Sequence, residues 1–385
     1  MGHKRDKHVQ RCRKALRSAT KRSSQKTDDI PIGTIRIKAS DLDPYQMTKD
    51  GWKRVIRLRR DLECAYDTIS LFRACGTFDH LIDKKDPRFL KGQLSADGKV
   101  QGSRVDMLPD AEKLEKAYSL FSKNLIVHDQ STDDHWDVLY ENIGGTLNYI
   151  YTIKKREEAT RQKYKKVEIF EKRYPLIRKK AACSLKDPDD QIALPMYTLL
   201  KTYMRVGSEV YYKANGHKGL TTLTRHDIRI TGDNVTFNYI GKDGVPITIT
   251  ESFPPTYIRR LKELLRGSGK SPFIFKNEQT KRPLNDTHFR CAFKRYCGEE
   301  FYPHIVRSYY ATSKAKGFIE HKKQRKEPAT LQEIRELFIE IASKLGHKRY
   351  DKKRQEWVES YTVTVNHYIQ PEIVTKIHAL VRPMR

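Results

Sequence analysis

No stretch of this sequence approaches the roughly 18 consecutive apolar residues of a membrane-spanning helix, so we expect no transmembrane segment. The six cysteines form no CxxC pair and have no regular spacing, which argues against a structural zinc site or a disulfide framework. No secretory signal is recognisable, so we expect reduced thiols in an intracellular protein. A phosphate-binding loop of the form GxxxxGKS or GxxxxGKT is also missing.

Acidic residues are scarce relative to basic ones. The 385 residues include 48 Asp and Glu against 76 Lys and Arg, a formal net charge of +28. Such an excess favours a polyanionic partner, because cations that neutralise phosphates release condensed counterions. The simpler alternative is a charged surface that only keeps the protein soluble. The 21 tyrosines among these cations suit contact with a nucleic-acid backbone, although most are expected in the core.

Composition divides the chain into three parts: residues 1–30, 31–155 and 156–385. The first 26 residues carry ten Lys and Arg and few large apolar residues, which predicts a flexible basic arm or a nuclear address. Apolar residues in 31–155 recur at intervals of three and four, which predicts a mostly helical domain. It shows cationic helix faces and no catalytic constellation, and the family resemblance described below implies that it clamps DNA.

The predicted helices of this second part cover three segments, residues 49–90, 110–127 and 134–153. Residues 154–186 then carry 13 Lys and Arg with apolar residues between them. They predict a basic amphipathic helix that either connects the domains or begins the last one.

Three short strands are predicted between residues 203 and 250. Val235, Phe237 and Tyr239 alternate with polar residues, and two glycine-containing turns separate the strands. The second turn, Gly241 to Gly244, contains Lys242. A lysine at a hairpin tip is usually a solvated surface residue, but the tip can also direct an ammonium group toward a ligand.

Five residues suggest a common chemistry: Arg205, Lys242, Arg307, His347 and Tyr368. Each one has an ordinary structural explanation, such as a helix-terminal arginine, a helix cap or a packed aromatic ring. Together they match the needs of metal-free strand cleavage. Two guanidiniums and a histidine can bind the phosphate oxygens, a tyrosine can attack phosphorus, and a lysine can protonate the leaving 5′ oxygen.

The sequence resembles a known family in the segments that carry these residues. The type IB DNA topoisomerases, which share a superfamily with the tyrosine recombinases, have active-site motifs similar to RVGSEVYY, GLTTLTRHDI, FNYIGKDG, HIVRSYYATS, LGH and VNHYIQPEIV. The resemblance covers roughly residues 160–380. It implies an α+β fold, with a mostly helical catalytic domain and a small antiparallel sheet, in addition to the helical N-terminal domain expected above.

The resemblance also implies the role of each residue. Arg205 and Arg307 would be the two catalytic arginines, Lys242 the general acid, His347 the phosphate-binding histidine and Tyr368 the nucleophile. The enzyme would form a 3′-phosphotyrosyl link to duplex DNA, let the cut strand swivel and reseal it. It would need neither ATP nor a metal, because the phosphotyrosyl ester keeps the energy of the broken bond.

Two departures keep alternatives open. The segment His304-Ile-Val-Arg307 is more similar to the HxxR motif of recombinases, and 21 residues including a charged run separate His347 from Tyr368. Tyr361 is a second nucleophile candidate. The chain could therefore be a site-specific recombinase, integrase or telomere resolvase, or a DNA-binding protein without activity.

A topoisomerase is expected as a monomer and a recombinase as a DNA-assembled oligomer. Both would be DNA-associated, in the cytoplasm and nucleoid or in the nucleus.

Overall fold

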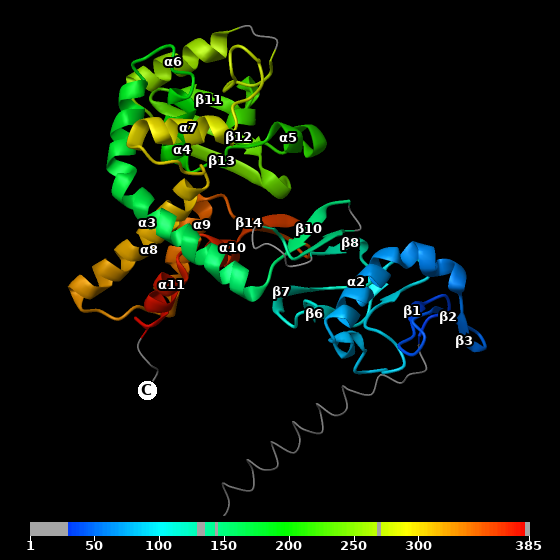
Figure 1. Ribbon diagram of the computed structural model, residues 1–385. Coiled ribbons are helices and arrows are strands. Elements are labelled where there is room, and N and C mark those ends of the chain that lie inside the picture. The colour runs from blue at the N-terminus through cyan, green and yellow to red at the C-terminus, as the bar shows by residue number, and fades with distance from the viewer. Residues whose placement is uncertain (1–29, 129–134, 143–144, 268–270, 382–385) are drawn as a thin grey trace, which may run out of the picture. The chain divides into compact units, whose positions relative to one another are not determined.

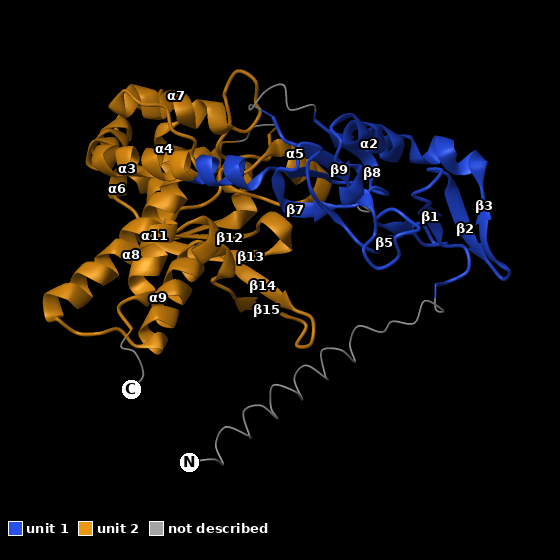
Figure 2. Cartoon of the chain, turned by 60° about the horizontal axis from the view of Figure 1, so that its bottom comes forward, with its two compact units in different colours: residues 1–160 blue, residues 161–385 orange. Residues whose placement is uncertain are grey.

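The computed structural model describes residues 30–128, 135–142, 145–267 and 271–381 (Figure 1). The basic arm expected over residues 1–30 lies outside the described residues except for its last position. The chain forms two compact units, residues 1–160 and residues 161–385 (Figure 2).

Unit 1 consists mainly of short antiparallel strands. They form a five-stranded sheet in the order β3-β2-β1-β4-β5, a three-stranded sheet β10-β9-β8 and the pair β6-β7. The elements are β1 (Ile35–Ile37), β2 (Pro44–Thr48), β3 (Gly51–Arg54), η1 (Ile56–Leu62), α2 (Glu63–Ala74), η2 (Phe78–Leu81), β4 (Gln93–Leu94), β5 (Val100–Gln101), β6 (Val105–Met107), β7 (Lys113–Tyr118), β8 (Lys123–Val127), β9 (Val138–Glu141) and β10 (Leu147–Ile150).

The prediction of a mostly helical domain over residues 31–155 was wrong. Within the segment expected to be one helix, residues 49–90, the structure has the helices η1, α2 and η2, whereas the described residues of 110–127 and 134–152 form the strands β7 to β10 and their turns. Leu114 and Tyr118 explain the error, because both are buried on one face of β7 and lie four residues apart. Residues four apart lie on the same face of a strand, where side chains alternate with a period of two. They also lie on the same face of a helix, about one turn apart.

Unit 2 is mostly helical and contains a three-stranded antiparallel sheet in the order β11-β12-β13. The α+β class predicted for the chain is therefore confirmed, and so are the three strands.

The helices that carry or adjoin the site are α3 (Ile153–Ser184), α4 (Ala193–Thr202), α5 (Glu209–Asn215), α8 (Ile305–Arg325), α9 (Leu331–Lys344), α10 (Thr362–His367) and α11 (Pro371–His378). The remaining elements are η3 (Leu220–Thr222), η4 (Arg225–Asp227), β11 (Ile228–Thr231), β12 (Asn234–Ile240), η5 (Lys242–Gly244), β13 (Pro246–Ser252), α6 (Pro255–Arg266), α7 (Asp286–Cys297), β14 (Lys348–Asp351) and β15 (Glu356–Glu359).

Helix α3 matches the basic amphipathic helix predicted over residues 154–186. One face carries the buried residues Tyr164, Val167, Phe170 and Ile177, and the other faces are charged. The first turn of α3 belongs to unit 1, where its cations form ion pairs. These pairs are Lys154–Glu112, Lys155–Asp137 and Arg156–Glu115.

Two buried clusters stabilise unit 2. The larger one joins α3, α4, α6 and α7 to the inner face of the sheet and includes Phe170, Phe237, Tyr257 and Phe293. The smaller one lies between α8, α9, α10 and α11. Burying this much apolar surface is the main force that holds the helices together.

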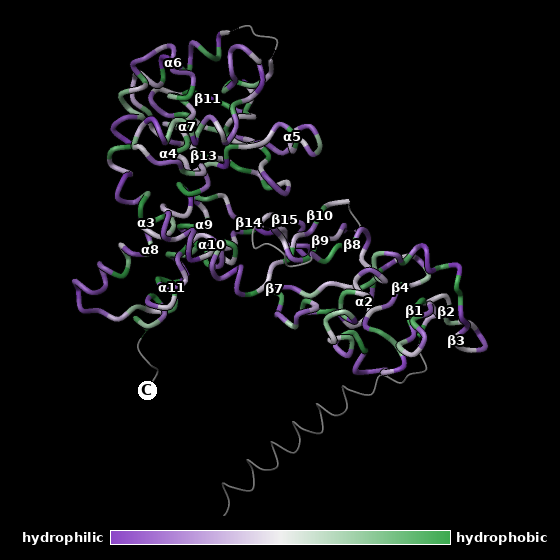
Figure 3. Tube along the Cα trace, in the orientation of Figure 1, coloured by the Kyte–Doolittle hydropathy of each residue, from purple (hydrophilic) through white to green (hydrophobic). Residues whose placement is uncertain are grey.

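No helix among the described residues is long and apolar enough to cross a membrane. Short hydrophobic stretches alternate with hydrophilic ones along the trace of both units (Figure 3).

Candidate active site

Arg205 lies in the loop between α4 and α5, next to the segment that leads into η3. The Leu220 amide donates to the Arg205 carbonyl at 2.8 Å, and the Thr221 amide donates to the Val206 carbonyl at 2.7 Å. A Cβ on Gly219 would lie 2.6 Å from backbone atoms of Gly207, so the two segments meet where neither has a side chain. This close approach fixes the backbone that carries Arg205.

Lys242 lies at the tip of the β12–β13 hairpin, where the sequence predicts it. Ile240 pairs with Pro246 at the end of the ladder, and Asp243 adopts the left-handed backbone conformation with φ of 63°. The Lys242 side chain lines a small cavity in unit 2.

Arg307 lies in the first turn of α8 and is buried, with only 3% of its surface exposed. Its Nη1 donates to the Tyr203 carbonyl at 2.6 Å, and its Nη2 donates to the Leu345 carbonyl at 2.8 Å. Burial lowers the pKa of this guanidinium. Within the described residues no carboxylate pairs with Arg307 and its Nε has no hydrogen-bond partner. Among the described residues the buried charge is therefore compensated by neutral groups, namely the two carbonyls and the His347 ring, and an anion would stabilise it.

His347 follows the end of α9 and contacts Arg307 directly. The Arg307 Nη2 lies 2.9 Å from His347 Nε2, and Thr364 Oγ1 lies 2.7 Å from Nδ1. Because arginine only donates, Nε2 must accept and the proton must be on Nδ1, which donates to Thr364. Burial, with Arg307 and Arg205 nearby, lowers the pKa of His347 to about 3, so the ring is neutral.

Tyr368 follows the last residue of α10, and its ring is part of the smaller buried cluster, with 3% exposed. Arg205 Nη2 donates to the Tyr368 hydroxyl at 3.0 Å. The His347 ring centroid lies 4.7 Å from that of Tyr368, and the Arg307 guanidinium carbon lies 5.2 Å from it. The phenol is therefore in contact with three of the other four predicted residues.

The cavity of about 160 Å³ that Lys242 lines is also lined by Arg205, Arg307 and His347. Four of the five predicted residues thus line one cavity, and the fifth, Tyr368, contacts three of them. Most of the other charged lining residues are cationic, namely Lys218, Lys344, Lys348 and Arg349, whereas Asp243 is acidic. This lining suits an anion such as a phosphodiester.

His304 is a site residue to which the sequence assigned no role. It precedes α8, and its ring centroid lies 5.1 Å from that of Tyr368. Burial, with Arg307 and Arg205 nearby, lowers its pKa to about 3. The HxxR spacing was the available signal, since it puts His304 and Arg307 one helical turn apart. Tyr361, the second nucleophile candidate, instead packs on Phe338 at 5.9 Å.

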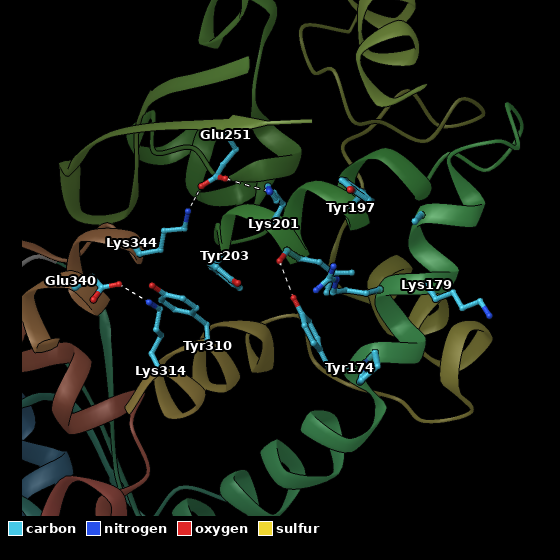
Figure 4. A pocket seen from close by; sticks show the side chains of 14 residues that line it. Tyr174, Lys179, Tyr197, Lys201, Tyr203, Glu251, Tyr310, Lys314, Glu340 and Lys344 are labelled. Atoms are coloured by element: carbon cyan, nitrogen blue, oxygen red, sulfur yellow. Dashed lines mark hydrogen bonds and ion pairs between the residues drawn. The ribbon is translucent and has the colours of Figure 1, made fainter. Parts of the chain in front are cut away.

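A larger cavity of about 870 Å³ in unit 2 shares lining residues with this site (Figure 4). The Tyr203 ring stacks on Tyr310 at 4.2 Å there, while Lys201 and Lys344 both pair with Glu251. Tyr203 and Lys344 line both cavities. The Tyr203 carbonyl accepts a hydrogen bond from Arg307. The stacking of Tyr203 on Tyr310 therefore helps to fix the residue that positions this guanidinium. Among the described residues no group of three or more His, Cys, Asp or Glu is arranged to hold a metal ion.

Comparison with known proteins gives three further findings. The family described as eukaryotic DNA topoisomerase I, catalytic core, matches residues 152–373. DNA topoisomerase 1B of Acanthamoeba polyphaga mimivirus is 27% identical over 169 residues, which are 41% of this chain and 49% of that protein. The chain therefore spans about half the length of this curated relative.

Two solved structures of the XerH site-specific recombinase bound to difH substrates are also similar. The pre-cleavage complex has 15% identity and a TM-score of 0.28, and the alignment covers 44% of this chain and 45% of that chain. The post-cleavage complex with a palindromic substrate has 17% identity and a TM-score of 0.29, with 46% and 49% covered.

Proposed function

Because the chain belongs to the family of the eukaryotic DNA topoisomerase I catalytic core, we propose that it nicks and reseals one strand of duplex DNA and thereby relaxes supercoils. The observation that carries this proposal is that Arg205, Lys242, Arg307 and His347 line one cationic cavity and that Tyr368 contacts three of these four residues.

In the proposed reaction the Tyr368 oxygen attacks the phosphorus of a phosphodiester. The bond from phosphorus to O5′ breaks, and the 3′ end stays attached to the enzyme as a phosphotyrosyl ester. The phenolic proton leaves to the neutral imidazole of His304, which lies beside the ring. Lys242 donates a proton to the departing O5′, and the reverse steps reseal the strand without ATP or a metal.

The two arginines stabilise the negative charge that grows on the non-bridging oxygens. Arg205 reaches the Tyr368 hydroxyl and can therefore hold a phosphate against it. Arg307 has a buried charge that an incoming phosphate would offset. His347 can donate to the phosphate from Nε2 once Arg307 Nη2 turns from this nitrogen to the phosphate and the ring proton moves to Nε2, with the Thr364 hydroxyl then donating to Nδ1.

The direct test is relaxation of a supercoiled plasmid in EDTA without ATP. We expect the wild-type protein to relax the plasmid and to form a covalent adduct at Tyr368, and we expect Tyr368→Phe to do neither. Binding of DNA without any adduct would instead identify a DNA-binding protein that lacks strand-cleaving activity.

The position of His304 beside the Tyr368 ring favours a second candidate, a site-specific recombinase, integrase or telomere resolvase with the same chemistry. Such an enzyme would form the adduct on one particular DNA sequence, would not relax plasmids generally, and would assemble into an oligomer on its site. A topoisomerase would act as a monomer on many sequences. Mapping of the adduct sites, together with the mass of the protein–DNA complex, distinguishes the two.

A further inference from the structure

The backbone on both sides of Tyr368 is held by side chains from two other helices. Lys163 of α3 donates to the His367 carbonyl, and Tyr164 of α3 donates to the Ile369 carbonyl at 2.7 Å. Thr312 of α8 donates to the Tyr368 carbonyl at 3.3 Å. Three consecutive carbonyls are thus bound by side chains more than 50 residues away in sequence.

The donors are fixed in place. Tyr164 is 4% exposed and Thr312 is 2% exposed. Burial raises the pKa of Tyr164, so this phenol stays protonated and can only donate to the carbonyl it faces. The Thr312 hydroxyl also accepts from the Gln370 amide at 3.3 Å. It therefore satisfies one carbonyl and one amide of the segment that joins α10 to α11.

Carbonyls at the end of a helix lack partners within that helix and are satisfied by water, by side chains or by a tighter last turn. Here the short helix α10 ends at His367, and the following turn contains the proposed nucleophile. Water would leave that turn free to move, whereas two buried side chains and a lysine fix it relative to α3 and α8. Thr312 and Arg307 are on the same helix, so α8 sets the position of the phenol relative to a phosphate-binding group.

We propose that Lys163, Tyr164 and Thr312 are positioning residues that hold the Tyr368 backbone ready for attack. We call these three side chains the backbone clamp. The proposal rests on the function proposed above and adds how that site is organised. Tyr164 and Thr312 act through the backbone of the nucleophile, whereas the Lys163 ammonium also lies over the Tyr368 ring, 5.7 Å from its centroid.

This role has a distinctive kinetic consequence. Attack requires the phenol oxygen to be held close to phosphorus and in line with O5′, and misplacement by about 1 Å can cost on the order of 100-fold. Before cleavage the clamp supplies this order, but in the covalent adduct the new bond to phosphorus supplies it. Loss of a clamp residue should therefore slow cleavage and leave resealing almost unchanged, so that the covalent fraction at equilibrium falls.

The experiment compares Tyr164→Phe with Tyr257→Phe in the full-length protein. Each substitution removes one buried hydroxyl, but Tyr257 bonds to Thr198 within the larger core cluster. Single-turnover rates of cleavage and of resealing are measured at saturating DNA, on a duplex that is nicked close to the cleavage site. For Tyr164→Phe we expect cleavage about 10-fold slower and resealing within about twofold of wild type. We expect Tyr257→Phe to match wild type in both rates.

A second pair of variants tests the clamp at its other helix. Thr312→Val keeps the shape but removes the hydroxyl, and it should repeat the Tyr164→Phe result. Thr312→Ser keeps the hydroxyl and should restore cleavage to near the wild-type rate.

The outcomes are distinguishable. If the wild-type protein forms no adduct, the proposed function itself is wrong. If it forms the adduct but Tyr164→Phe behaves like Tyr257→Phe, the backbone clamp is wrong while the function stands. Equal slowing of cleavage and resealing, or weaker DNA binding as the only defect, would also overturn the positioning role.

Discussion

His304 and His347 illustrate how burial fixes the chemical form of single side chains in this site. Both rings lie against Tyr368 and near two guanidiniums, and both have a pKa lowered to about 3. In the unfolded chain each imidazole would titrate near its ordinary value of about 6.5. The folded protein therefore binds fewer protons than the unfolded chain between these two values.

This difference predicts a pH dependence of stability. Because protonation favours the unfolded state, the contribution of the two rings is fully present above about pH 6.5 and is lost as the pH falls toward about 3. We expect the free energy of unfolding to fall between pH 7 and pH 4.5 more steeply in wild type than in a His304→Gln, His347→Gln double variant. Urea unfolding of both proteins at pH 7 and pH 4.5 measures this difference. An equal fall in the free energy of unfolding in the two proteins would contradict the lowered pKa of the two histidines.

Tyr368 combines a core position with a chemical role. Its ring is buried with Ile369, Ile373 and Ile377, while its hydroxyl is bound to Arg205. The packing fixes the ring, and the hydrogen bond joins the oxygen to Arg205, which lines the cationic cavity. A buried phenol in this site is therefore compatible with attack on a bound phosphate.

At the scale of elements, the β12–β13 hairpin carries a single proposed task, the presentation of Lys242. We expect Lys242→Ala to slow cleavage by about 100-fold or more, because the leaving O5′ loses its proton donor. The measurement uses duplex DNA with either oxygen or sulfur at the 5′ bridging position of the cleavage site. A 5′ thiolate leaves without a proton, so the sulfur substrate should recover much of the rate. Equal defects on both substrates would remove Lys242 from the general-acid role.

The close approach of Gly207 and Gly219 is the second element-scale feature that the site needs. An added Cβ in Gly219→Ala would meet Gly207 backbone at 2.6 Å, so the segment that carries Arg205 must shift. We expect a loss of about 1–3 kcal/mol in the free energy of unfolding and a large loss of cleavage.

The matched control is Gly317→Ala in α8, where the added carbon meets nothing within 4 Å. Alanine is the better helix former, so this variant should be more stable by about 0.5–1 kcal/mol and keep its activity. Urea unfolding and single-turnover cleavage of both variants provide the test. Unchanged stability and activity in Gly219→Ala would contradict the importance of the close approach.

At the scale of the whole molecule, the net charge of +28 favours binding to the proposed partner, duplex DNA. Some cations of α3 are engaged within unit 1, since Lys154, Lys155 and Arg156 form ion pairs there. The ten Lys and Arg of residues 1–26 stand against a single Asp, so this segment carries a net charge of 10 − 1 = +9 of the total +28.

We expect the affinity for duplex DNA to fall steeply with salt, by about 0.9 logarithmic units per tenfold change in salt for each phosphate neutralised. Removal of residues 1–29 should make this slope shallower and leave single-turnover cleavage at saturating DNA unchanged. Binding is measured between about 50 and 200 mM salt with Tyr368→Phe, which cannot trap DNA covalently. An identical slope in the shortened protein would show that the arm contributes no phosphate contacts.

The sequence alone determined the features that depend on neighbouring residues. The alternation of Val235, Phe237 and Tyr239 and the glycines around Lys242 were sufficient for the hairpin, because strand period and turn geometry are local. The basic helix over residues 154–186 was predictable for the same reason. The order of five cationic, donor and nucleophilic residues predicted the chemistry, although their roles stay predictions.

Only the tertiary structure decided which distant residues meet. Arg205 and Tyr368 are 163 residues apart, and Tyr164 and Ile369 are 205 apart, so no local pattern reports either hydrogen bond. The strands of unit 1 were missed because a spacing of four, as between Leu114 and Tyr118, fits both a helix and a strand until the partner strand is known. Local periodicity reports which face of a segment is buried, whereas the packing of the whole chain determines what that face is buried against.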